Sequence, residues 1–312
     1  MNHFPRLAEE LFTIRDWLRF SVSQFEESDI FFGHGTDNSY DEAVWLIMSA
    51  LHLPHDTLNN FLDAVITEQE RKHLAHLIEQ RITKRTPTAY LVREAWLRGF
   101  KFYVDERVIV PRSFIAELLD FNETGEHGLQ PWIVHPELIN SAADICTGSG
   151  CLGVLLANAF PDAQIDVVDI SPDAIAVANI NIANYGLQDQ ITAIQSDMFT
   201  ALKGQDGKPK LYDLIISNPP YVDAPSMATL PTEYRNEPQL ALGSGVAGLD
   251  HTHTILRKAA KHLNDEGILV VEIGHNRDAL LDAYPDLPFT WLEVESGNQF
   301  VFLLTKEQLG VA

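Results

Sequence analysis

The stretch that decides the fold reads LYDLIISNPPY and covers residues 211–221. Its mostly apolar first half is typical of a buried strand, and the two consecutive prolines must end that strand because proline has no N–H to donate to a sheet. The amide of Asn218, carbonyls released from the sheet and the ring of Tyr221 then lie at the carboxyl end of the strand. Ligands bind at that end in an open α/β sheet. An ordinary turn with a surface tyrosine is the alternative.

Strand and helix patterns alternate from residue 142 onward, which is typical of a parallel, doubly wound sheet. The expected strands cover residues 142–146, 164–170, 191–195, 211–217, 267–273, 291–296 and 299–305. The expected helices cover residues 151–160, 172–185 and 251–264. Only Gly297 and Asn298 separate the last two strands, and so short a turn permits only an antiparallel hairpin. We therefore expect an α/β fold with a seven-stranded, mostly parallel sheet and one antiparallel strand.

The chain before this sheet has a different pattern. Apolar residues recur at helical spacing, and Ser39-x-x-Glu42 and Thr67-x-x-Glu70 match the capping box that opens a helix. Further on, short runs at 90–91 and 100–104 predict strands, and residues 113–141 are expected to hold two helices around a polar loop at 122–128. The expected organisation is a small helical domain at 1–86, a β-hairpin linker at 87–112 and the sheet domain at 113–312.

The composition limits the partners and the compartment. Lys and Arg number 22 against 44 Asp and Glu, so the formal net charge is −22. Such a surface repels phosphate backbones, which disfavours stable binding to duplex DNA, and it attracts a basic protein. The two cysteines are too few for a disulfide framework, no apolar run is long enough to span a membrane, and Glu9 and Glu10 interrupt any signal-peptide pattern. We expect a cytoplasmic protein without membrane contact.

Glycines cluster in the first turn from strand to helix of the sheet domain. Residues 144–153 read DICTGSGCLG, in which Gly148, Gly150 and Gly153 match G-x-G-x-x-G. Glycine lets a backbone turn tightly and approach a ligand closely, because no Cβ stands in the way. Asp169 ends the next expected strand, where a carboxylate can accept hydrogen bonds from the two hydroxyls of a ribose. A carboxylate that only serves the entry to the next helix is the alternative.

Asp197 and Met198 follow the third expected strand. An acid at this place can accept a hydrogen bond from the exocyclic amine of an adenine, and an apolar neighbour can pack on the ring. An ordinary loop acid is the alternative. With Asp169 these residues predict a nucleoside pocket that does not require a phosphate, which suits either a dinucleotide or S-adenosyl-L-methionine.

The Asn-Pro-Pro-Tyr sequence favours S-adenosyl-L-methionine and a nitrogen acceptor for its methyl group. An amide or aromatic amine is a poor nucleophile because its lone pair is delocalised. The Oδ1 of Asn218 and the carbonyl of Pro219 can accept its two N–H groups, orient the lone pair and stabilise the positive charge that develops on the nitrogen. Tyr221 can pack on the flat group. This chemistry requires no metal, no covalent nucleophile and no strong base.

Taken together, the glycine turn, Asp169, Asp197 and residues 218–221 resemble the class I (Rossmann-like) methyltransferases that use S-adenosyl-L-methionine. The Asn-Pro-Pro-Tyr end narrows the resemblance to enzymes that methylate adenine N6, guanine N2 or protein glutamine N5. The segments that resemble the glutamine branch are TPTAYL (86–91), Phe102 and VPR (110–112). The segments that resemble its subfamily for the third large-subunit ribosomal protein are FGHGTDN (32–38), DICTGSGC (144–151) and VDIS (168–171).

This resemblance implies roles for individual residues. The residues implied for the cofactor site are Cys146, Thr147, Gly148, Ser149, Gly150, Asp169, Asp197, Met198 and Asn218. The residues implied to hold the glutamine amide are Asn218, Pro219, Pro220 and Tyr221. Two departures from the release-factor subfamily favour the ribosomal-protein subfamily. Met198 stands where that subfamily commonly has an aromatic ring, and Ser113 stands where it has a proline.

The sequence therefore predicts methylation of the N5 nitrogen of a glutamine in the third large-subunit ribosomal protein, a basic partner met either free or in an assembling ribosome. The helical domain and hairpin are expected to recognise that partner, and the irregular stretch at 222–250 is expected to be a lid or a peptide-binding loop. The alternatives are methylation of release factors, methylation of adenine or guanine in nucleic acid, a nicotinamide-dependent dehydrogenase and a non-catalytic assembly factor.

Overall fold

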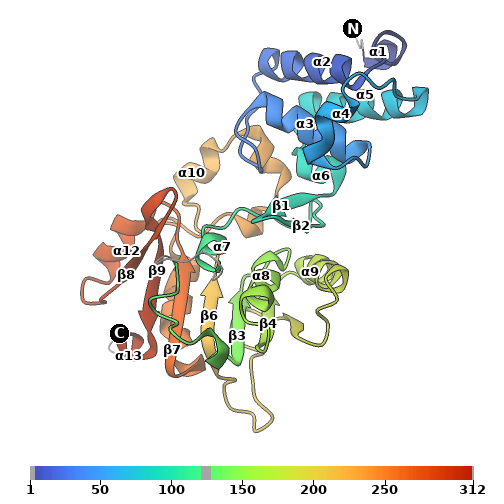
Figure 1. The fold of residues 1–312 in the computed structure, drawn as a ribbon. Coiled ribbons are helices and arrows are strands. Elements are labelled where there is room, and N and C mark those ends of the chain that lie inside the picture. The colour runs from blue at the N-terminus through green and yellow to red at the C-terminus, as the bar shows by residue number, and fades with distance from the viewer. Residues whose placement is uncertain (1–3, 121–127, 311–312) are drawn as a thin grey trace. The chain divides into compact units, whose positions relative to one another are not determined.

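The computed structural model describes residues 4–120 and 128–310 (Figure 1). The chain divides into two compact units. The first comprises Met1–Trp96, Val104–Glu106 and Pro231–Glu237, and the second comprises Leu97–Tyr103, Arg107–Leu230 and Pro238–Ala312. Among the described residues, no helix combines the length and the apolar character needed to cross a membrane.

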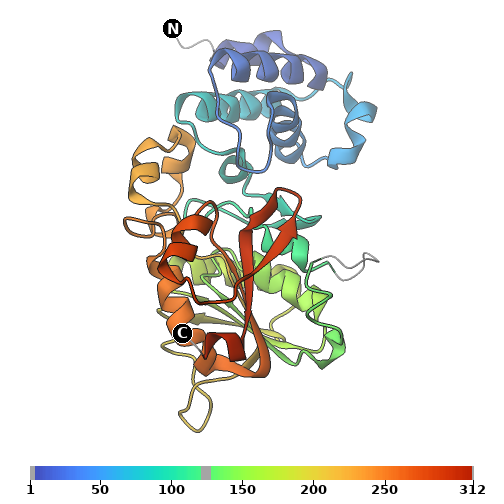
Figure 2. The same cartoon turned by 90° about the vertical axis from the view of Figure 1, so that its left-hand side faces the viewer.

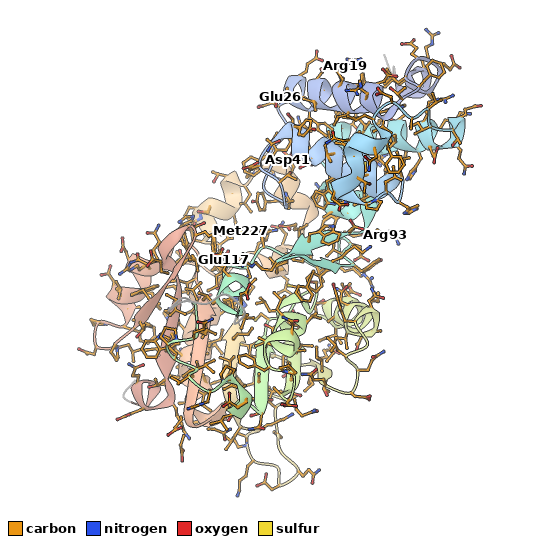
Figure 3. All side chains as sticks on the ribbon, in the orientation of Figure 1. Arg19, Glu26, Asp41, Arg93, Glu117 and Met227 are labelled. Carbon is orange, nitrogen blue, oxygen red and sulfur yellow. The ribbon has the colours of Figure 1, made fainter. Side chains whose placement is uncertain are left out.

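The first unit is mostly helical, as the blue and cyan ribbons of Figure 2 show. Its elements before the sheet domain are α1 (Phe4–Glu10), α2 (Ile14–Glu27), α3 (Ser39–Ala50), η1 (His55–Thr57), α4 (Leu58–Phe61), α5 (Glu68–Thr83) and α6 (Thr88–Val92). Their apolar faces enclose one core, in which Trp17, Phe25, Leu46 and Leu74 are fully buried. Between α2 and α3, the hydroxyl of Ser39 donates to Glu26, a residue labelled in Figure 3.

Capping residues set the ends of these helices, and they agree with the sequence only in part. Thr67 forms the expected capping box with Glu70 at the start of α5. At α3, however, the cap is Asn38, whose side chain accepts the N–H of Asp41, and not Ser39. Thr13 forms a further capping box that separates α1 from α2.

The stretch at 87–112 holds a short helix and a two-stranded sheet. The expected strand at 90–91 is wrong, because the carbonyl of Pro87 accepts the N–H groups of Tyr90 and Leu91 and winds the segment into α6. Strands β1 (Ala95–Leu97) and β2 (Phe100–Phe102) then pair with each other, two residues apart in the sequence. This is the expected hairpin, with its first strand later in the sequence than predicted.

A seven-stranded sheet forms the centre of the second unit. Its strands are β3 (Ser141–Ile145), β4 (Gln164–Asp169), β5 (Ile191–Gln195), β6 (Tyr212–Ser217), β7 (Leu263–Glu272), β8 (Thr290–Val294) and β9 (Gly297–Thr305). They lie in the order β5-β4-β3-β6-β7-β9-β8 (Figure 1). Strands from β5 to β7 are parallel, whereas β9 runs antiparallel to both of its neighbours. The expected mostly parallel sheet with one antiparallel strand is confirmed.

Helices cover both faces of this sheet. Because successive side chains of a strand point to opposite faces, Leu214 and Ile215 belong to two different apolar clusters. The first cluster includes residues of α7 (Ile115–Leu118), α8 (Cys151–Ala159) and α9 (Pro172–Asn184). The second includes residues of α11 (Asp250–Ala259), α12 (Arg277–Ala283) and α13 (Lys306–Leu309). The strands are thus buried on both sides, which explains their continuous apolar runs.

The remaining segments are short. Between 113 and 141 the structure has α7 and the 3-10 turn η2 (Pro136–Leu138), so the second expected helix is wrong; most of the expected polar loop at 122–128 falls outside the described residues. The stretch at 222–250 holds α10 (Ala224–Thr229), η3 (Thr232–Asn236) and η4 (Gln239–Ala241), and α11 is followed by η5 (Ala260–His262). Of this stretch, Pro231–Glu237 belongs to the first unit.

Candidate active site

The carboxyl ends of the central strands meet at one edge of the sheet. The register pairs Ile145 with Val168 on one side and with Ser217 on the other, so β3, β4 and β6 end at the same level. The hydroxyl of Ser217 donates to the carbonyl of Ile145 at 2.6 Å and ties two of these ends together. The chain moves outward from β3 to β5 and then returns to β6 on the other side. This is the switch point where open α/β sheets bind ligands.

The glycine turn after β3 has the conformations that its residues require. Gly148 has φ +55° and Gly150, the N-cap residue of α8, has φ +79°. A Cβ placed on Gly148 would meet nothing within 4 Å, so open space lies beside this backbone. A Cβ on Gly153 would stand 2.3 Å from Val167, so this glycine allows α8 to pack closely on β4. Gly148 is therefore the member of the motif that faces room for a ligand.

Asp169, at the end of β4, is held by the backbone. Its Oδ2 accepts the N–H of Gly148 at 3.0 Å and its Oδ1 accepts the N–H of Ser171 at 2.9 Å. Burial raises the pKa of this carboxyl, and these hydrogen bonds oppose the rise. The carboxylate thus serves the helix entry, as the alternative interpretation has it, and also lies at the wall of the pocket described next.

A pocket in the second unit lies over these strand ends. The residues predicted from the sequence that line it are Cys146, Gly148, Asp169, Asp197, Met198, Asn218 and Pro220. The predicted residues that are not among its lining are Thr147, Ser149, Gly150, Pro219 and Tyr221. Cys146 and Met198 both have positive φ values, +65° and +47°, which are uncommon for residues other than glycine and often mark functional sites.

Two of the predicted residues outside the lining, Thr147 and Ser149, make contacts that hold the glycine turn beside the pocket. The hydroxyl of Thr147 donates to the buried carboxyl of Asp144, and burial raises the pKa of Asp144 to about 7. The carbonyl of Ser149 accepts a hydrogen bond from the side chain of Asn181 at 2.8 Å. These contacts hold the glycine turn in place.

Tyr221 is fixed from three directions. Its hydroxyl donates to Glu272 at 3.1 Å, and its carbonyl accepts the side-chain N–H of Asn276 at 2.7 Å. Its ring lies on Gly274, where an added Cβ would stand 2.6 Å from Cε2 of the ring. The ring therefore has a defined place directly after the pocket residue Pro220.

Several residues of the site were not predicted. Arg107, Val108, Ile109, Pro238, Leu240, Ala241 and His251 also line the pocket. The ring of His251 lies 2.7 Å from the hydroxyl of Ser244, and burial lowers the pKa of this imidazole. His251 lies in the first turn of α11, and the others come from loops or a short 3-10 turn, where no periodicity marks a residue as part of a site. One feature of the sequence could have pointed to Glu272, because it is an acid at the end of a strand and directly follows a run of apolar residues.

The described residues contain no group of three or more His, Cys, Asp or Glu side chains that could hold a metal ion. A buried carboxylate, a solvent-accessible amide and open backbone at a glycine turn are instead suited to the hydroxyls, amines and flat rings of a nucleoside ligand.

Comparison with known proteins assigns the family. A family model described as a methyltransferase small domain matches residues 133–231. A ribosomal protein uL3 glutamine methyltransferase of Neisseria gonorrhoeae is 57% identical over 306 residues, which cover 98% of this chain and 98% of that protein. The protein of the same name from Bordetella pertussis is 50% identical over 301 residues, 96% of this chain and 97% of that one. The chain therefore belongs to the family of the ribosomal protein uL3 glutamine methyltransferases.

Proposed function

We propose that this chain transfers the methyl group of S-adenosyl-L-methionine to the side-chain amide nitrogen (N5) of a glutamine in ribosomal protein uL3. The observation that carries the proposal is the identity of 57% to a protein of that name along 98% of both chains. An identity of this size that extends over both units supports a common reaction and a common substrate. The pocket at the end of β6 supplies side chains suited to that reaction.

The pocket residues fit the cofactor. Each oxygen of Asp169 already accepts one backbone N–H and keeps a second lone pair, which suits the two hydroxyls of a ribose. Asp197 and Met198 suit the amine and the ring of adenine, and Gly148 allows the close approach of a ligand. When bound, S-adenosyl-L-methionine supplies a methyl group that its positively charged sulfur makes electrophilic.

Asn218 is suited to hold the glutamine amide. Its side chain lines the pocket and makes no hydrogen bond to any residue that the structure describes. Its Oδ1 and the carbonyl of Pro219 can each accept one N–H of the substrate amide, which turns the lone pair of the nitrogen toward the methyl group. Both acceptors also stabilise the positive charge that develops on nitrogen. After transfer the nitrogen is acidic, so its proton can pass to water.

The two units suggest a division of labour. The second unit holds the pocket, and the first unit, which includes Pro231–Glu237, has no expected part in methyl transfer. We assign to the first unit, with the hairpin β1–β2, the recognition of uL3. The net charge of −22 supports a basic partner and disfavours stable binding to duplex DNA. Since ribosomal proteins are made in the cytoplasm, the enzyme acts there.

The test is methyl transfer from labelled S-adenosyl-L-methionine to purified uL3, with mass spectrometry to locate the methyl group. We expect one methylated glutamine. Asn218→Ala should lower kcat by at least about 100-fold, the effect of losing a preorganised acceptor in a closed site. Asn179→Ala, at an exposed asparagine of α9, is the matched control and should keep full activity.

Parallel assays separate the alternatives. The methyl-transfer assay is run on unassembled uL3 and on ribosomal particles from cells that lack the enzyme. The sample that accepts the methyl group faster shows which form of uL3 is the substrate. Methylation of a release factor, of RNA or of DNA in preference to uL3 would refute the substrate assignment. Saturable binding of NAD without binding of S-adenosyl-L-methionine would refute the cofactor assignment.

A further inference from the structure

The carboxylate of Glu272 lies at the carboxyl end of β7 and has no exposed surface. Three donors from two other segments converge on it. The hydroxyl of Tyr221 donates to Oε1 at 3.1 Å, and the hydroxyl of Ser113 and the N–H of Phe114 donate to Oε2 at 2.7 and 2.9 Å. A buried carboxylate is costly even when it is well paired, and an apolar residue would often serve stability better. A buried acid with so many partners therefore suggests a function.

The partners of Glu272 show what it holds. Ser113 is itself oriented, because its Oγ accepts the N–H of Ile115 at 3.2 Å while it donates to the carboxylate. The carboxylate is thus anchored on one side to the segment that begins α7. Its other oxygen, Oε1, accepts a hydrogen bond from the hydroxyl of Tyr221, which lies three residues after Asn218 in the sequence.

Without this contact Tyr221 would keep its backbone hydrogen bond to Asn276 and its place on Gly274 but would lose the hydrogen bond from its hydroxyl to Glu272. A phenol ring turns about two side-chain torsions, and this hydrogen bond restricts that rotation at the hydroxyl end. A group that packs on a flat amide must keep a defined tilt to hold that amide in line for reaction.

We propose that Glu272 is a positioning residue for methyl transfer, which fixes the hydroxyl of Tyr221 and thereby the plane against which the substrate glutamine packs. Ser113 and the backbone of Phe114 hold the carboxylate in the orientation that this requires. The inference rests on the proposed function, because it takes Tyr221 as part of the substrate site. Glu272 itself is not among the residues that line the pocket.

The experiment combines Tyr221→Phe, Glu272→Gln and the double variant at pH 8. Tyr221→Phe keeps the ring and removes the anchor, and Glu272→Gln keeps the shape but replaces one acceptor oxygen by an amide N–H₂. Each single variant should lower kcat/KM for uL3 about tenfold, the size expected for one hydrogen bond to a charged group. The double variant should also lose about tenfold, and not a hundredfold, because both changes remove the same contact. The Kd of S-adenosyl-L-methionine should change less than about twofold.

Control measurements show whether a loss of activity comes from misplacement of Tyr221, from a loss of folding, or from a wrong assignment of the reaction. Glu117→Gln removes another carboxylate of the second unit, one that accepts the N–H of Glu295, and should behave as wild type. Circular dichroism and thermal unfolding check that the variants fold. If the folded variants unfold at a lower temperature but keep the kcat/KM of wild type, or if the double variant loses about a hundredfold, the inference is overturned. If wild type itself does not methylate uL3, it is the proposed function that fails.

Discussion

At the scale of single residues, the carboxylate of Asp169 combines two roles, one in the backbone turns around it and one in cofactor binding. Its oxygens accept the N–H groups of Gly148 and Ser171, and we assign the ribose hydroxyls to the same carboxylate. Asp169→Ala should raise the Kd of S-adenosyl-L-methionine about 100-fold, since two hydrogen bonds to a charged group are lost. Calorimetric titration measures this. Asp173→Ala, at an exposed acid of α9, is the control, and an unchanged Kd for Asp169→Ala would contradict the assignment.

Glu272 also makes stability depend on pH. Burial raises the pKa of this carboxyl from 4.5 to about 7. Between these values the folded protein holds a proton that the unfolded chain has released, so the free energy of unfolding falls as pH rises from about 4.5 through 7. This group alone accounts for about 3 kcal/mol. Asp144 changes stability in the same direction, because burial raises its pKa to about 7 as well.

The measurement is urea unfolding of wild type and Glu272→Gln at pH 5 and pH 8. The variant does not titrate at this position, so its stability relative to wild type should rise between the two pH values. All other groups cancel in this comparison. A difference that stays constant with pH would show that Glu272 does not titrate in this range.

At the scale of elements, a helix or strand could be predicted where its own residues show a clear pattern, and not where single hydrogen bonds decide the local structure. The buried strands β3, β4 and β6 could be predicted because helices cover both of their faces and most of their buried positions are therefore apolar. The strand predicted at 90–91 from its apolar residues was wrong, because two hydrogen bonds to the carbonyl of Pro87 make this segment helical. Likewise, Asn38 and Ser39 are both good capping residues, and the sequence alone does not choose between them.

The residues of the candidate site likewise fall into those that the sequence could predict and those that it could not. Gly148, Asp169 and Asn218 lie at the carboxyl ends of strands or within three residues after them, so their order along the chain was enough to group them. Glu272 and the pocket wall at Pro238 could not be grouped, since their partners lie on segments distant in sequence. Their contacts depend on register between strands and on the course of irregular segments, and neither leaves a periodic pattern.

The segment Pro231–Glu237 offers a prediction at this scale. It belongs to the first unit, where Glu233 lies 3.4 Å from the guanidinium of Arg81 and accepts the N–H of Phe31. Arg81 also pairs with Glu42, and all three charged side chains are buried. Arg81→Ala should destabilise the first unit by about 3–5 kcal/mol, because Glu42 stays buried without its cation and Glu233 keeps only Arg85, at 3.7 Å.

Urea unfolding followed by tryptophan fluorescence measures this loss, since Trp17 lies in the core of the first unit. Arg15→Ala is the matched control. It removes an arginine whose ion pair with Asp63 is exposed to solvent, and it should leave the unfolding midpoint nearly unchanged. Equal effects of the two substitutions would show that the buried cluster does not anchor the segment.

At the scale of the whole molecule, the net charge of −22 should be visible in the kinetics. Attraction between an acidic enzyme and a basic ribosomal protein is screened by salt, whereas contacts inside a closed pocket are screened much less. The KM for uL3 should therefore rise about tenfold between about 50 and 300 mM NaCl, while kcat and the Kd of S-adenosyl-L-methionine change less than about twofold. A short uncharged peptide that contains the target glutamine is the control, because its KM should not respond to salt. If the KM for uL3 is equally insensitive, the acidic surface serves solubility and not recognition.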